Sequence, residues 1–253
     1  MNGVFYIGAT GLNAQQTAVD ITANNVSNIN TAGYKRGVVS FSELVGATSP
    51  NERSSPSSNA NGVMATPALH VFTQGDLRPT GNALDLAIRG DGFIELQARS
   101  GDSVLWRGGT LHIGEDGYLT APNGLPLHAM ITVPSDATSL TIRADGQVLA
   151  ALPDQSELLE LGNIELVRAK DSGRLLSLGD GMYGIAEDDL TLSRGVPGED
   201  NAGLIAQGFS EASNVQLSDE LVNLMIYQRA YAANARLVQI GDELMGIANG
   251  LKR

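Results

Sequence analysis

The stretch that decides the fold is EASNVQLSDELVNLMIYQRAYAANARLVQIGDELMGIANGLKR, at residues 211–253. Its apolar residues recur in steps of three and four, which is the spacing of an α-helix. The first row contains Leu217, Leu221, Leu224, Gln228, Tyr231, Ala235 and Val238, and the second row contains Ile226, Ala230, Ala233, Leu237, Ile240, Leu244, Ile247 and Leu251. Ser218-Asp219-Glu220 offers a cap and negative charge at the helix start, and Lys252-Arg253 offers positive charge at its end, as the helix dipole favours. Two rows on one helix predict partners on two sides.

The first segment of the chain has the same helical spacing. Its rows contain Val4, Ile7, Gly11, Ala14, Ala18 and Ile21, and Phe5, Leu12, Val19 and Val26. They predict a helix from about residue 3 to about residue 30, roughly 40 Å long, with Asn30 or Gly33 as a left-handed stop. No other apolar helix is predicted between residues 36 and 214. One row of the C-terminal helix therefore pairs with this helix, and the other is expected to meet copies of the protein.

Asparagines are concentrated in ANNVSNINTAGYKR, residues 23–36. Asparagine is a poor helix former because its amide competes for the backbone. Asn24 and Asn28 fall on one side of the predicted helix, whereas Asn25 continues the row that ends at Ile21. A polar amide in a packed row costs stability but fixes register and partner number. The alternative is that these amides face solvent.

Composition excludes several classes of function. The chain has 253 residues, of which 42% are hydrophobic and 5% aromatic, a net charge of −12 and a pI near 4.6. That charge argues against nucleic acid as a partner, because binding phosphates needs clustered Lys and Arg. The absence of cysteine excludes disulfides, thiolate chemistry and cysteine metal sites. No apolar run approaches the ~20 residues of a membrane span. The first basic residue is Lys35, so we expect no secretory signal, and either a cytosolic location or export without a cleaved leader.

The middle of the chain has the alternation of β-strands. Leu84, Leu86 and Ile88 alternate, and Leu140 and Ile142 do the same further on. Asp-Gly favours hairpin turns, because both turn positions need positive φ. Such pairs occur at Asp91-Gly92, Asp116-Gly117 and Asp145-Gly146. An antiparallel, all-β region is therefore predicted.

These patterns predict an α+β fold in three parts. Terminal helices in residues 1–35 and 213–253 pair as a coiled-coil-like domain, and residues 81–212 form an antiparallel all-β central domain. Residues 36–80 form an extended linker. Within it, residues 46–66 are rich in Ser, Asn and Pro and cannot bury enough surface to fold alone. They are a linker or a segment that contacts with something else would order.

No motif in the sequence predicts catalysis, and none predicts a cofactor or a metal. Gly179–Gly184 matches G-x-G-x-x-G, but no helical pattern follows it, which favours a turn between strands. The histidines lie far apart along the chain. Arg89-Gly90-Asp91 spells an adhesion tripeptide, although a hairpin explains it better. A carboxylate pair for glycoside hydrolysis stays open among the acidic residues.

Three blocks of the sequence resemble the flagellar basal-body rod and hook proteins. They are ANNVSNINTAGYKR, then GNALDLAIRGDGFIEL at residues 81–96, then SNVQLSDELVNLMIYQRAYAANARLVQIGDELM at residues 213–245. They occur in the family's order and cover both ends and the middle of the chain. QRAYAANARL and ITVPSDATSLTIRADGQV are most similar to the distal segment of the rod, and the proximal segment is the alternative.

The resemblance implies a structural subunit that assembles head to tail into a helical tube and transmits torque across the periplasm. Its terminal helices would pair and line the core of the tube, with the β domain outside. The implied partners are copies of itself, neighbouring rod and hook axial proteins, the outer rings of the basal body and the flagellar type III export apparatus. No nucleic acid and no small-molecule ligand are implied, and export leaves no cleaved signal. A rod-associated peptidoglycan hydrolase is the enzyme alternative.

On this view the assembly interface has members at both ends of the chain. The residues predicted to form it are Leu12, Val19, Asn24, Asn25, Asn28, Gly33, Tyr34, Leu221, Leu224, Tyr231, Leu237, Ile240 and Leu244.

Overall fold

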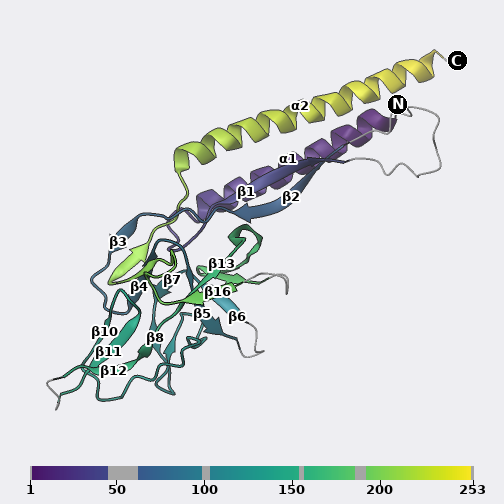
Figure 1. The fold of residues 1–253 in the computed structure, drawn as a ribbon. Coiled ribbons are helices and arrows are strands. Elements are labelled where there is room, and N and C mark those ends of the chain that lie inside the picture. Colours follow the sequence, from purple (N-terminus) through teal and green to yellow (C-terminus); the bar gives the residue numbers. More distant parts are fainter. Residues whose placement is uncertain (1, 45–61, 99–102, 154–156, 186–191, 252–253) are drawn as a thin grey trace, which may run out of the picture. The chain divides into compact units, whose positions relative to one another are not determined.

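The structure is a computed structural model of the whole chain, and it describes every residue except 1, 45–61, 99–102, 154–156, 186–191 and 252–253. It contains two long helices and many antiparallel strands (Figure 1), so the predicted α+β class with an all-β central region is confirmed. The chain divides into two compact units. The first unit contains residues 1–27, 37–69 and 215–253, and the second contains residues 28–36 and 70–214. Among the described residues, neither helix is apolar over enough of its length to cross a membrane.

The first unit contains both long helices and a two-stranded sheet. Its elements are α1 (Asn2–Ser27), β1 (Gly37–Glu43), β2 (Val63–His70, whose last residue belongs to the second unit) and α2 (Leu217–Gly250). The helices are antiparallel, because Gly8 lies against Val238 whereas Asn25 contacts Glu220. Figure 1 shows them side by side, in purple and yellow-green.

The first helix ends at Ser27, earlier than the periodicity predicted. The carbonyl of Asn28 accepts a hydrogen bond from the Thr31 amide at 3.1 Å, and its side chain accepts one from the Thr31 hydroxyl at 3.1 Å. This local turn competes with continuation of the helix. Gly33 is left-handed, with φ +70°, but it lies beyond the end of the helix, and Asn30 is not left-handed. The prediction that either residue stops the helix was wrong.

The second helix begins without the predicted cap. Gln216 is its N-cap residue and makes no capping bond through its side chain. The predicted negative charge is present, since Asp219 and Glu220 lie in the first turn, but Glu220 is buried and accepts a hydrogen bond from Asn25. The predicted basic pair, Lys252-Arg253, lies outside the described residues.

The second unit is built from short antiparallel strands. Its largest sheet has six strands, in the order β14 (Leu176–Gly179), β15 (Met182–Gly184), β6 (Ser103–Trp106), β5 (Phe93–Gln97), β13 (Leu166–Ala169) and β16 (Leu192–Gly195). Two three-stranded sheets contain β17 (Leu204–Gln207), β4 (Asp85–Arg89) and β7 (Gly108–Thr110), and β10 (Ser139–Ile142), β11 (Gln147–Ala151) and β12 (Leu159–Asn163). Two pairs contain β18 (Phe209–Glu211) with β3 (Leu77–Pro79), and β8 (His112–Ile113) with β9 (Leu119–Thr120). A 3-10 turn, η1, spans Ser172–Arg174.

The core of this unit lies between its sheets. Strands β4 and β5 are buried along most of their length, so both of their faces contribute side chains. Strand β10 alternates as predicted, with Leu140 and Ile142 buried and their neighbours exposed. The main cluster runs from Leu86 to Ile205 and includes Trp106, and a smaller one gathers Phe93, Leu105, Val167, Leu175 and Tyr183.

Two of the three predicted Asp-Gly hairpins are confirmed. Asp116-Gly117 joins β8 to β9, and Asp145-Gly146 joins β10 to β11. Asp91-Gly92 does not form a hairpin, because β4 and β5 belong to different sheets. The backbone of this loop bonds to the Arg107 side chain and to the Gly203 amide in place of a partner strand. Gly179–Gly184 is a turn between paired strands, as predicted.

The predicted linker, residues 36–80, contains the strands β1, β2 and β3, and its Ser-, Asn- and Pro-rich part, residues 46–66, is described only in part. Residues 63–66 begin β2, and residues 46–61 lie outside the described residues. Its conformation and contacts therefore stay a prediction.

Candidate assembly interface

The two helices meet through small and polar side chains. The buried row on α1 consists of Gly8, Gly11, Ala14, Ala18, Thr22 and Asn25. A Cβ atom at Gly8 would lie 2.5 Å from Val238 Cγ2, and one at Gly11 would lie 2.8 Å from Asn234 Nδ2. The absence of a side chain at these glycines therefore allows an approach that a larger residue would prevent.

This contact face differs from the predicted apolar row. Gly11, Ala14 and Ala18 were predicted to be in it, but Val4 and Ile7 are exposed. The helix is turned so that small residues face α2 along most of the contact, while Val4 and Phe5 lie against Gly241 of α2 near the start of α1. Close approach of the two backbones is the physical reason.

The second row of α2 is exposed. The buried or half-buried positions of this helix are Glu220, Asn223, Leu224, Tyr227, Ala230, Asn234, Ala235, Val238, Gly241 and Met245. They include part of the first row but only Ala230 of the second. The exposed large side chains of the second row are Ile226, Leu237, Ile240, Leu244, Ile247 and Leu251. A contiguous apolar face of this kind marks an interaction site.

The predicted interface residues fall into three groups. Asn24, Leu221, Tyr231, Leu237, Ile240 and Leu244 are exposed, Leu12, Val19, Asn28, Tyr34 and Leu224 are half-buried, and Asn25 and Gly33 are buried. Asn28, Gly33 and Tyr34 belong to the second unit, so the structure does not group them with the helix residues. Their role in assembly stays a prediction.

Asn25 connects three elements of the first unit. Its side-chain amide donates to the Gly37 carbonyl at 2.8 Å and to Glu220 Oε2 at 3.2 Å, and its oxygen accepts from the Gly37 amide at 2.9 Å. It is 1% exposed, so the solvent-facing alternative was wrong for this residue. These contacts fix α1 against β1 and α2 within one chain.

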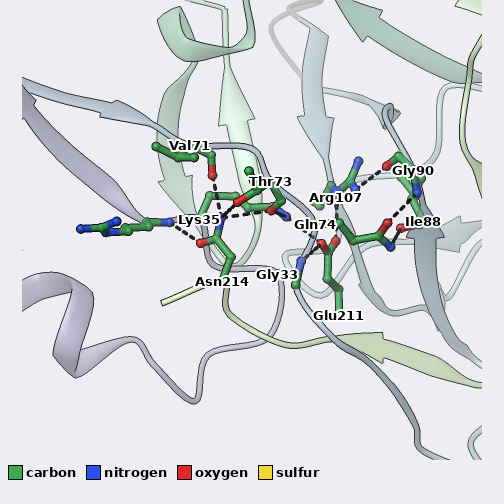
Figure 2. A network of polar contacts seen from close by, with 12 residues as sticks. Gly33, Lys35, Val71, Thr73, Gln74, Ile88, Gly90, Arg107, Glu211 and Asn214 are labelled. Carbon is green, nitrogen blue, oxygen red and sulfur yellow. Dashed lines mark hydrogen bonds and ion pairs between the residues drawn. The ribbon is translucent and has the colours of Figure 1, made fainter. Parts of the chain in front are cut away.

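Sequence reasoning missed a buried ion cluster in the second unit, shown in Figure 2. Lys35 Nζ lies 2.7 Å from Glu211 Oε1, and Arg107 Nε lies 2.9 Å from Glu211 Oε2. The three side chains are 0%, 2% and 3% exposed for Lys35, Glu211 and Arg107. Burial lowers the pKa of Lys35, and the Glu211 carboxylate opposes that shift.

The cluster is completed by backbone groups. Lys35 Nζ also donates to the Thr73 carbonyl at 3.0 Å, and the Gly75 amide donates to Glu211 Oε1 at 2.9 Å. Arg107 donates to the backbone carbonyl of Gly90 in the loop after β4 (Figure 2) and to that of Gly92 in the same loop. A buried charge is tolerated when it is paired and hydrogen-bonded in this way.

Asn214 extends these contacts along the chain. Its oxygen accepts from the Arg36 amide at 2.7 Å, and its Nδ2 donates to the carbonyls of Val71 at 2.7 Å and Thr73 at 3.0 Å. Residues 33–36, 71–75 and 211–214 are therefore held together by side chains of the last segment (Figure 2).

A second ion pair makes the stability of this unit depend on pH. Arg194 donates to both oxygens of Glu95, at 2.7 and 2.8 Å, and this hydrogen bonding lowers the carboxyl pKa below its usual 4.5. A depressed carboxyl pKa adds stability that is present above the usual pKa and is lost as the pH falls through the lowered one.

We therefore expect the denaturant concentration at the midpoint of unfolding of this unit to decrease as the pH is lowered from about 5 to about 3. Fluorescence of Trp106, the single tryptophan of the chain, measures it. The fall should be smaller in Glu95→Gln. Identical pH profiles for the two proteins would show that this pair contributes nothing.

Three family models match the chain at its two ends and its middle. The flagella basal body rod protein model matches residues 5–35, the flagellar hook protein FlgE/F/G D1 domain matches residues 87–150, and the flagellar basal body rod FlgEFG protein C-terminal model matches residues 206–251. The first and third models coincide with α1 and α2. The second model covers β4 to β11 of the second unit, which is called the β unit below.

Similar proteins extend over nearly the whole chain. Flagellar basal-body rod protein FlgG of Agrobacterium fabrum is 33% identical over 253 residues, covering 96% of this chain and 97% of the relative. FlgG of Borreliella burgdorferi is 31% identical, with 100% of both chains covered. FlgF of Caulobacter vibrioides is 31% identical, with 96% and 95% covered.

The chain belongs to the flagellar basal-body rod protein family. Within the family it is most similar to FlgG, which is the distal rod component, and its likeness to FlgF is the weaker one. The protein is thus a structural component of the flagellar basal body and serves motility. The family is not enzymatic, so the hydrolase alternative is set aside.

Proposed function

We propose that this protein builds the distal rod by self-assembly, head to tail, into a helical tube that transmits torque. The observation that carries the proposal is the exposed second row of α2. Leu237 is 49% exposed and Ile240 is 44% exposed, on a helix that already contacts α1 through other residues. Burying such a row against other subunits supplies the hydrophobic free energy of assembly.

The two helices form one coiled-coil-like assembly domain in this proposal. The contact brings α1 and α2 close together through Gly8 and Gly11, and it leaves the large side chains of the second row of α2 exposed. In this proposal the second row of one copy contacts a different surface of the next, with a rotation between copies that does not close a ring. Repeated contacts of that kind produce a filament.

A proximal position in the rod is the second candidate. The likeness to FlgF of Caulobacter vibrioides favours it, and the likeness to FlgG of two distant bacteria favours the distal position. The contact between α1 and α2 described above suits a subunit of either the distal or the proximal rod segment.

Membership of the family supports assembly with other rod and hook axial proteins. We further propose that the rod spans the periplasm inside the outer rings of the basal body. The subunit would reach it through the flagellar type III export apparatus, without a cleaved signal peptide.

Cysteine protection tests the proposed burial of the second row. The chain has no cysteine, so Ile240→Cys and Asp116→Cys each introduce a single thiol. Both positions are exposed in one chain, so both thiols should react with a maleimide in dilute protein. In assembled protein the thiol at position 240 should react at least about 10-fold more slowly, because packed subunits exclude the reagent. The thiol at position 116, at a hairpin tip of the β unit, should keep its rate. Equal rates at position 240 in both states would refute burial of this row.

A further inference from the structure

The buried ion cluster lies outside the hydrophobic core of its unit. The main core cluster runs from Leu86 to Ile205, and the smaller one from Phe93 to Tyr183. Neither includes a buried residue of the segments 28–36 or 209–214. Both clusters therefore draw their buried side chains from outside the two segments, and the hydroxyl of Tyr183 donates to the Gly33 carbonyl at 3.4 Å.

Three bonds attach the first of these segments to the second, beside others that come from His70, Val71, Thr73 and Tyr183. The Gly33 amide donates to the Glu211 carbonyl at 2.8 Å, the Lys35 ammonium to the Glu211 carboxylate, and the Arg36 amide to the Asn214 side chain. Glu211 follows Lys35 by 176 residues. A contact so distant in sequence costs loop-closure entropy and gains nothing until both segments are in place.

The buried charges also favour late attachment of the two segments. Before Glu211 arrives, closing the unit would bury Lys35 and Arg107, two cations, without the carboxylate that contacts both. An uncompensated buried charge is strongly destabilising. Because synthesis runs from the N-terminus, Lys35 and Arg107 stay solvated until Glu211, close to the end of the chain, has been made.

We propose that Lys35, Arg107 and Glu211 form a closing latch, which forms after the core and makes closure of the β unit conditional on the arrival of residues 211–214. The latch is a conformational device within one chain and does not depend on the assembly proposed above. Its consequence is an accessible open state, in which the core is folded and residues 28–36 are detached. Residues 28–36 follow α1 directly in the chain, so their detachment frees this connecting segment from the β unit.

Hydrogen exchange of the unmodified, full-length protein tests this order directly. The latch amides are those of Gly33, Gly75 and Arg36, and the core amides are those of Leu111 and Leu119, which are bonded to backbone carbonyls. After correction for intrinsic rates, the latch amides should exchange as one group, at least about 10-fold faster than the core amides, because they open in a smaller event. One common opening free energy for both groups would overturn the proposal.

The same hydrogen-exchange measurement on the variant Glu211→Gln provides a second test. It keeps the shape of the side chain and removes the negative charge, so the open state should become the predominant one. The latch amides should then lose nearly all protection, while Leu111 and Leu119 stay protected at least about 100-fold. Loss of protection at both groups together would show that the cluster is part of the core's own folding unit, which contradicts a latch.

Discussion

A chain that carries Leu237→Asp or Ile240→Asp is expected to fold and to lose assembly. Both side chains are exposed in the single chain, so a carboxylate there should change its stability by less than about 0.5 kcal/mol. In the assembled state the same carboxylate is buried without a partner, at a cost of several kcal/mol in every subunit. The concentration needed for assembly should rise at least about 100-fold, which sedimentation of assembled protein measures.

Gln239→Asp is the matched control, since it adds the same charge on the same turn but outside both apolar rows. It should sediment like the unmodified protein. The helix signal in circular dichroism should be the same in all three variants. Normal assembly and normal swimming with Leu237→Asp would remove the role assigned to the second row.

The second large effect is expected at Glu211. Glu211→Gln leaves two buried cations without their shared anion and should lower the free energy of unfolding of the β unit by about 3 kcal/mol. Trp106 is fully buried in this unit, so its fluorescence during urea denaturation gives the measurement without a signal from the helices.

Lys35→Met is the comparison that separates charge from packing. It leaves Arg107 paired with Glu211, and the Thr73 carbonyl keeps its bond from Asn214. The Glu211 carboxylate then balances a single cation and no uncompensated charge is left buried, so the loss should stay below about 1 kcal/mol. Equal losses in the two variants would mean that the carboxylate has no special role in balancing the cations.

Both long helices could be predicted from the sequence because their signal is local. Steps of three and four residues repeat over many turns, and no distant partner is needed to recognise them. The hairpins at Asp116-Gly117 and Asp145-Gly146 are local in the same sense. The turn at Asp91-Gly92 has the same sequence signal, but Arg107, which lies between β6 and β7, bonds to the backbone there, so the local rule failed.

The direction that each helix faces could not be predicted. The predicted contact row included Gly11 correctly but placed Ile7 in the contact, where the structure has Gly8, because close approach favours small residues. Periodicity alone does not distinguish a face that contacts a helix of the same chain from one that contacts another copy.

The ion cluster was also beyond sequence reasoning. Lys35 and Glu211 lie at opposite ends of the β unit's sequence, and neither has a neighbouring residue that indicates a partner. Asn25 was identified as a residue in a packed row. Its partners, Gly37 and Glu220, required the fold.

Electron microscopy of the purified, full-length protein at increasing concentration tests the central claim most directly. The account predicts rods or tubes of uniform diameter that lengthen with concentration, and none at the same concentrations with Leu237→Asp. Monomers or closed dimers of the unmodified protein at every concentration would contradict it, as would tubes formed equally well by the variant.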